Sequence, residues 1–167
     1  NPSGVDPIDT RDTISFAPYM TQKDLVAAGA FLLVFCIMLF YLPNYLGHPD
    51  NYIPANPLQT PAHIVPEWYF LPFYAILRAI PDKLFGVLAM GGAIVSFAAL
   101  PWLDRSYVRS CRYRPVWKWC VWIFVADFLV LMYCGAMPAE EPYVTISRIG
   151  TAYWFGFLFV LAPLVGK

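Results

Sequence analysis

The sequence predicts an all-α membrane protein with four transmembrane helices and a long, partly helical interfacial loop between the first and second. Of the 167 residues, 59% are hydrophobic and only 13% are charged, whereas a soluble domain carries about a quarter charged residues. Four apolar stretches each approach the roughly 20 residues that span a bilayer. A chain this short could not enclose four such helices in a polar shell, so buried soluble helices are disfavoured.

The elements follow in a simple order along the chain. Residues 1–22 form a polar, proline-containing lead segment, and residues 23–167 form one transmembrane domain. The predicted helices are 25–46, 84–103, 119–137 and 149–165, with a loop at 47–83. Three of these stretches are uncharged, and the third carries Asp127.

Basic residues set the predicted orientation, because Lys and Arg in short loops favour the negative side of the membrane. Arg11 and Lys23 lie in or next to the lead segment, and the loop between the second and third helices carries five more basic residues, Arg105, Arg109, Arg112, Arg114 and Lys118. Both segments are therefore expected on the negative side. The 11 basic and 11 acidic residues cancel, so no nucleic-acid partner is expected.

The 47–83 loop is longer than the about 12 to 15 residues of a passive connection, so it is expected to carry function. Its second half is strongly apolar and aromatic. This pattern predicts an interfacial helix along residues 68–77, opened by Pro66 and loosened by Pro72.

Glu67 stands out because it lies between Pro66 and Trp68, at the start of the most aromatic segment. It is interpreted either as a proton-handling carboxylate or as a helix-start residue held by backbone amides. Tyr69 and Tyr74 offer hydroxyls beside apolar rings, which suits a flat amphipathic ring such as a quinone. An aromatic belt at the membrane interface would give the same pattern.

Two other acidic residues admit two readings each. Asp24 lies beside Lys23 and after Phe16 at a membrane boundary, either as part of a site or as an ordinary helix-start residue with a snorkelling lysine. Asp127 is either functional, as intramembrane carboxylates often are, or a polar anchor to a neighbouring helix. No metal site is expected, since the four cysteines form no CxxC pair and both histidines, His48 and His63, lie in one loop.

The motif Pro66-Glu67-Trp68-Tyr69 resembles the PEWY signature of the quinol-oxidation site in the cytochrome b family. It is flanked by GHPDNYIPANPLQTPAHIVPEWYFLPFYAILRAIPDKLFGVLA, and the resemblance runs from Asn1-Pro2-Ser3-Gly4 to Gly166. It implies the C-terminal half of a cytochrome b, part of ubiquinol-cytochrome c reductase (respiratory complex III). The location would be the mitochondrial inner membrane or a bacterial cytoplasmic membrane.

The resemblance also implies roles for individual residues. Glu67 and Tyr74 would be catalytic at a positive-side quinol-oxidation site, lined by Pro66, Trp68, Tyr69 and Phe70. A second, negative-side site that reduces quinone would include Phe16, Lys23 and Asp24. A surface where an iron-sulfur protein docks is predicted on the same loop, at His63, Ile64, Val65 and Lys83.

The implied cofactors are ubiquinone or ubiquinol, and haem b ligated by the N-terminal half of cytochrome b rather than by this chain. The implied partners are that half, the Rieske iron-sulfur protein, cytochrome c1 and lipid, in a dimeric complex that couples electron transfer to proton translocation. The isolated chain would then be inactive.

Two alternatives stay open at this point. One is subunit IV of a plastoquinol-plastocyanin reductase, which is similar to only the first three helices, so the stretch 149–165 disfavours it. The other is a non-redox helical transporter subunit, in which Asp127 would be the coupling carboxylate.

Overall fold

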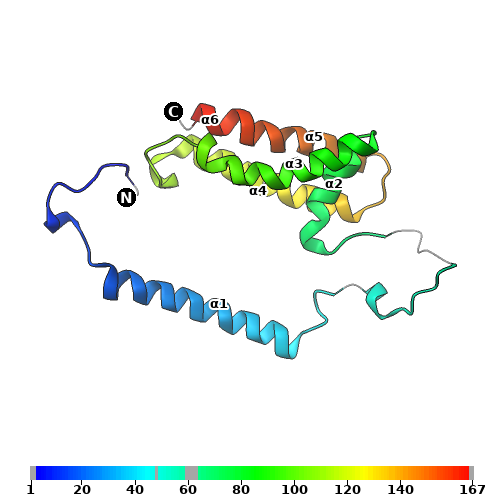
Figure 1. The fold of residues 1–167 in the computed structure, drawn as a ribbon, viewed down its shortest axis with the longest axis horizontal. Helices are drawn as coiled ribbons and strands as arrows, with labels where there is room; N and C mark the ends of the chain where they lie inside the picture. The colour runs from blue at the N-terminus through cyan, green and yellow to red at the C-terminus, as the bar shows by residue number, and fades with distance from the viewer. Residues whose placement is uncertain (1–2, 48, 59–63, 166–167) are drawn as a thin grey trace. The chain divides into compact units, whose positions relative to one another are not determined.

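A computed structural model describes residues 3–47, 49–58 and 64–165. It separates into a unit of Val5–Leu58 and a larger unit made of residues 3–4 and 64–165 (Figure 1). The described residues are helical or irregular and contain no strand. The all-α prediction is therefore confirmed.

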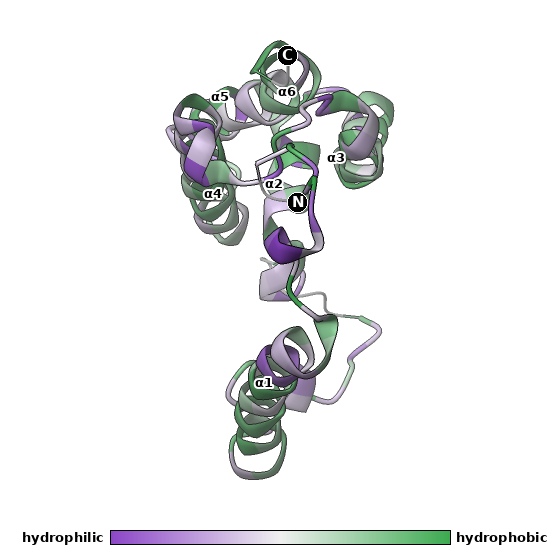
Figure 2. Cartoon of the chain, turned by 90° about the vertical axis from the view of Figure 1, so that its left-hand side faces the viewer, coloured by the Kyte–Doolittle hydropathy of each residue, from purple (hydrophilic) through white to green (hydrophobic). Residues whose placement is uncertain are grey.

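The smaller unit is built around α1 (Thr21–Tyr41). A 3-10 turn η1 (Thr10–Asp12) and a π turn η2 (Phe16–Met20) precede α1, and a 3-10 turn η3 (Pro49–Tyr52) follows it. No α1 residue is buried within the described chain, and most of its apolar side chains are exposed. Figure 2 shows that α1 is mostly hydrophobic along its length.

The larger unit is a helical bundle. Its elements are η4 (Trp68–Phe70), α2 (Leu71–Ala79), α3 (Lys83–Leu103), η5 (Cys111–Tyr113), α4 (Pro115–Ala136), α5 (Tyr143–Gly156), η6 (Phe157–Leu161) and α6 (Ala162–Val165). The last three run on as one helix, Tyr143–Val165.

Four helices in the described residues are long and apolar enough to cross a membrane: Thr10–Tyr41, Lys83–Leu103, Pro115–Ala136 and Tyr143–Val165. The prediction of four transmembrane helices is therefore confirmed. The short helix α2 is a fifth element that packs among three of them, against α3, α4 and α5.

Several boundaries differ from the expected ones. α1 ends at Tyr41 rather than at residue 46, because Leu42 precedes Pro43 and leaves the helical region with φ −130° and ψ 44°. α4 begins four residues early because Pro115 suits a first helical position. The last helix begins at Tyr143 rather than at residue 149, since Arg148 donates from Nε to the carbonyl of Ala79 at 3.0 Å and is thereby accommodated.

Pro72 also differs in its effect from the expectation. It is the second residue of α2, where the backbone amide would have no helical partner in any case. Pro72 therefore opens the helix rather than loosening it, and its side chain is buried.

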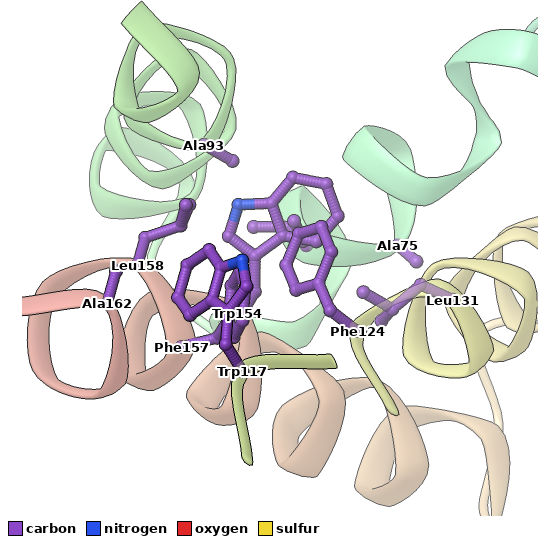
Figure 3. Close-up of a cluster of buried hydrophobic side chains, with 10 residues drawn as sticks. Ala75, Ala93, Trp117, Phe124, Leu131, Trp154, Phe157, Leu158 and Ala162 are labelled. Atoms are coloured by element: carbon purple, nitrogen blue, oxygen red, sulfur yellow. The ribbon is translucent and has the colours of Figure 1, made fainter. Parts of the chain in front are cut away.

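The core of the bundle is aromatic and aliphatic. Trp154, Ile76, Leu131 and Leu158 are fully buried, and Trp154 lies at the centre of the cluster (Figure 3). Because lipid is itself apolar, membrane helices associate mainly through close packing, which small residues permit. Gly135 of α4 lies against the carbonyl of Leu71, and a Cβ at Gly86 of α3 would lie 2.7 Å from the carbonyl of Leu77. The absence of a side chain at Gly86 and Gly135 thus allows α2 to pack closely against α3 and α4.

Candidate functional site

Glu67 is the residue that immediately precedes η4. Its backbone is extended, with φ −58° and ψ 154°, and its carbonyl accepts a hydrogen bond from the Phe70 amide at 2.9 Å. The Glu67 side chain is half-buried and forms no cap hydrogen bond to η4. Both interpretations of Glu67, as a proton-handling carboxylate and as a helix-start residue held by backbone amides, stay open.

The aromatic residues after Glu67 lead from the surface into the core. Trp68 and Tyr69 are exposed and meet edge to face, with ring centroids 5.9 Å apart. Phe70 is half-buried and lies 5.7 Å from Phe73, which lies 5.7 Å from the fully buried Trp154. Contacts of this kind are favourable beyond the area they bury, so the segment is anchored at one end and open at the other.

Helix α2 holds this segment in place through one face. The buried residues recur at helical spacing: Leu71, Pro72, Ala75, Ile76 and Ala79. They pack against α3, α4 and α5. Since η4 is continuous with α2, the position of Glu67 follows from the packing of α2 against three helices that come later in the chain.

Tyr74 lies on the half-buried side of α2, where Arg78 follows one turn later. The Arg78 guanidinium carbon lies 5.2 Å from the centre of the Tyr74 ring. The same guanidinium donates from Nη1 to the carbonyls of Gly135 at 3.2 Å and Met137 at 2.9 Å. Arg78 therefore joins the Tyr74 ring to the C-terminal end of α4.

The predicted docking residues lie at both ends of this region. Ile64 is exposed, Val65 is half-buried, and Lys83 is exposed at the first residue of α3. Asp82 caps that helix by accepting a hydrogen bond from the Phe85 amide at 3.0 Å. His63 lies outside the described residues.

The second group of predicted residues belongs to the smaller unit. Phe16 opens η2, and Lys23 and Asp24 lie in the first turn of α1. All three side chains are exposed. Within this unit, η2 and α1 bring them onto two consecutive helical turns.

Asp127 lies on α4 and faces α5. A Cβ at Gly150 would lie 2.7 Å from its Oδ1, so the glycine gives room to the carboxylate. Its Oδ2 is buried and has no hydrogen-bond partner in the described part of the chain. Both readings of Asp127 stay open.

The described residues contain no group of three or more His, Cys, Asp and Glu that could hold a metal ion. His48 and His63 lie outside the described ranges.

Comparison with known proteins identifies the family. The model of the family described as Cytochrome b(C-terminal)/b6/petD matches residues 54–155, which include the PEWY motif, all of α2, α3 and α4, and most of α5. The chain belongs to the cytochrome b C-terminal family. With its four apolar helices, it is part of an integral membrane protein.

Individual relatives span the whole chain. It is 60% identical over 167 residues to cytochrome b of Rickettsia conorii, covering 100% of this chain and 42% of that protein. It is 62% identical over 166 residues to cytochrome b of Rhodospirillum rubrum, covering 99% and 41%. Cytochrome b of Marchantia polymorpha is 54% identical, with 100% and 41% covered.

A solved structure of a hyperthermophilic respiratory Complex III superposes on 99% of this chain and 42% of its own, with a TM-score of 0.84 and 34% identity. The chain therefore spans about two fifths of the length of its curated relatives.

No role was predicted for Arg78 from the sequence. Its spacing of four residues from Tyr74 was a usable signal, because such pairs face each other on a helix. Its bonds to Gly135 and Met137 had no sequence signal, since they join positions 57 and 59 residues apart.

Proposed function

We propose that this chain supplies part of the cytochrome b subunit of ubiquinol-cytochrome c reductase, including the PEWY side of a quinol-oxidation site. The observation that carries the proposal is the placement of Glu67. It is held half-buried at the start of an aromatic segment whose far end is fixed in the bundle core. The fourth span favours this branch over subunit IV, because Trp154 within it is the centre of the core.

In this proposal Glu67 accepts a proton from the quinol hydroxyl and releases it on the positive side of the membrane. A carboxylate beside a helix start is stabilised by the amide dipoles there. Tyr74 adjoins the quinol, Pro66 and Phe70 line the pocket, and the exposed rings of Trp68 and Tyr69 cover its mouth. The site needs groups from another part of the protein, because both rings are open to solvent in this chain.

The electron chemistry belongs to cofactors held elsewhere. Haem b would be ligated by the N-terminal half of cytochrome b, and the quinol would deliver electrons to it and to a Rieske iron-sulfur protein. The present residues position the quinol and handle its protons. Cytochrome c1 and a second copy of the complex complete the proposed assembly.

Two further parts of the proposal concern surfaces. Phe16, Lys23 and Asp24 contribute to a quinone-reducing site on the negative side, where an acid, a base and an aromatic ring lie on consecutive turns. Ile64, Val65 and Lys83, with His63, form part of the surface on which the iron-sulfur protein docks. Their support is that Ile64 and Lys83 are exposed on either side of the segment that carries Glu67 and α2.

Substitution of Glu67 by Gln in the assembled parent complex tests the proposal. This change keeps the shape and removes the exchangeable proton, so quinol oxidation should fall by about 10² to 10⁴-fold. Glu140→Gln is the matched control, since Glu140 is exposed in the loop before α5. Equal rates in the two variants, at equal haem content, would remove Glu67 from the reaction.

A further inference from the structure

The loop between α3 and α4 forms, with the end of α3, an open cavity of about 530 Å³. It is lined by residues of two kinds: Phe97, Leu100 and Pro101 from the end of α3, and Asp104, Arg105, Ser106, Tyr107 and Arg109 from the loop. Because α3 and α4 are both long and apolar enough to span a membrane, the cavity lies at the membrane surface. It is separate from the Glu67 segment, whose residues do not line it.

The framework of the loop is rigid where it meets the helices. Arg114 donates from Nη1 to Oδ2 of Asp104 and from Nη2 to Oδ1, both at 2.9 Å. Its guanidinium carbon lies 4.7 Å from the centre of the Trp117 ring, and Nη2 also donates to the carbonyl of Val165 at 3.4 Å. Only 9% of the Arg114 side chain is exposed. Such paired bonds are the strong, geometrically defined kind.

This pairing decides the charge of the cavity. Burial of Asp104 acts to raise its pKa, but hydrogen bonds from Arg114 and the Ser106 amide, with the charges of Arg114 and Arg109, outweigh burial and hold the pKa below its usual value. The Asp104 carboxylate is therefore ionised and compensated by Arg114. The positive charges of Arg105 and Arg109 have no ion-pair partner within the described residues, so the lining of the cavity carries a net positive charge.

We infer that this cavity binds the phosphate headgroup of an anionic phospholipid, with Arg105 and Arg109 as its charged partners. Guanidinium groups match phosphate oxygens with paired hydrogen bonds, and basic pockets at the ends of transmembrane helices suit such headgroups. The hydroxyls of Ser106 and Tyr107 add neutral donors at the rim.

The apolar wall distinguishes a lipid from a free anion. Phe97, Leu100 and Pro101 continue the surface of the membrane-spanning helix α3, so the first segments of an acyl chain would lie along them. Trp102 is 75% exposed next to this wall, and tryptophan is enriched at this depth of the bilayer. A free phosphate ion would leave the apolar wall unused.

The test uses the assembled parent complex, which is delipidated and transferred to detergent micelles. Three conditions are compared: micelles with phosphatidylglycerol, micelles with phosphatidylcholine, and lipid-free micelles with added inorganic phosphate. Native mass spectrometry counts the lipids retained by the wild type and by the double variant R105Q/R109Q. The matched control is R112Q/K118Q, which removes two exposed basic residues of the same region that do not line the cavity.

Wild type and control should retain one more phosphatidylglycerol per copy of this chain than R105Q/R109Q does, and the double variant should bind it about 10- to 30-fold more weakly. Phosphatidylcholine and phosphate should show no such difference. Equal phosphatidylglycerol retention in all three proteins would overturn the inference. So would an equal loss in both double variants, equal binding of inorganic phosphate, or loss of a protein subunit from R105Q/R109Q with its lipid unchanged.

Discussion

The two units of this chain differ in how completely they build their candidate sites. Around Glu67, buried contacts of α2 with α3, α4 and α5 fix the segment, and an aromatic series runs from Phe70 to Trp154. Around Asp24, no α1 residue is buried, and Phe16, Lys23 and Asp24 are all exposed. Within the described residues, buried contacts of the bundle therefore fix the Glu67 segment, whereas α1 contributes no buried residue near Phe16, Lys23 and Asp24.

The largest effect is expected where α2 enters the bundle, at Gly135. A Cβ there would meet the carbonyl of Leu71, which is backbone and cannot swing aside. Gly135→Ala should therefore destabilise the assembled complex by about 3 kcal/mol, measured as a shift in thermal unfolding, and should lower quinol oxidation as well.

Gly91→Ala is the matched control for this change, because no described atom outside the adjacent backbone of its own helix lies within 4 Å of its new Cβ. Equal stability of the two variants would mean that the α2–α4 contact does not hold the Glu67 segment.

An intermediate effect on quinol oxidation is expected at Arg78, whose guanidinium group packs over the Tyr74 ring. Arg78→Met removes two charged hydrogen bonds to the end of α4 and the contact with the Tyr74 ring, a loss of about 2 kcal/mol. The KM for quinol should rise more than kcat falls, because a displaced Tyr74 weakens positioning. Arg78→Lys should restore part of the loss, and a pure kcat effect with unchanged KM would contradict a positioning role.

The smallest effect on quinol oxidation is expected from Asp24→Asn in the other unit. This change should slow quinone reduction by up to about 10²-fold and leave quinol oxidation nearly intact, as measured with inhibitors specific for each half-reaction. Asp12→Asn, in the exposed turn η1, controls for the loss of a charge in the same unit. Equal slowing of both half-reactions by Asp24→Asn would show that the two regions do not act separately.

Local signals were sufficient to predict much of this fold. Four apolar stretches gave four spans, because a bilayer imposes length and composition on any helix that crosses it. The ends were less predictable where a charge is satisfied by distant atoms, as Arg148 is by the carbonyl of Ala79. The predicted last helix began at residue 149, just after Arg148, and was therefore six residues shorter at its start than the observed helix, which begins at Tyr143.

The site was predictable only as a motif. PEWY identified the residues, but their surroundings depend on contacts that no local pattern records. The burial of α2 rests on Gly86 and Gly135, 49 positions apart, and the Asp104–Arg114 pair looked in the sequence like part of an ordinary basic loop. The sequence pattern therefore locates the helices, whereas contacts between distant residues determine which side chains are buried and which are exposed.

The central claim is that Glu67 carries a proton from quinol, and its most direct test is the pH dependence of quinol oxidation. Rates are compared between wild type, Glu67→Gln and Glu140→Gln in complexes with matched, full haem content. Wild type and Glu140→Gln should show the same rates across the pH range, and Glu67→Gln should oxidise quinol about 10² to 10⁴-fold more slowly and with a different pH profile. A Glu67→Gln profile that coincides with the wild type in both rate and shape would contradict the claim.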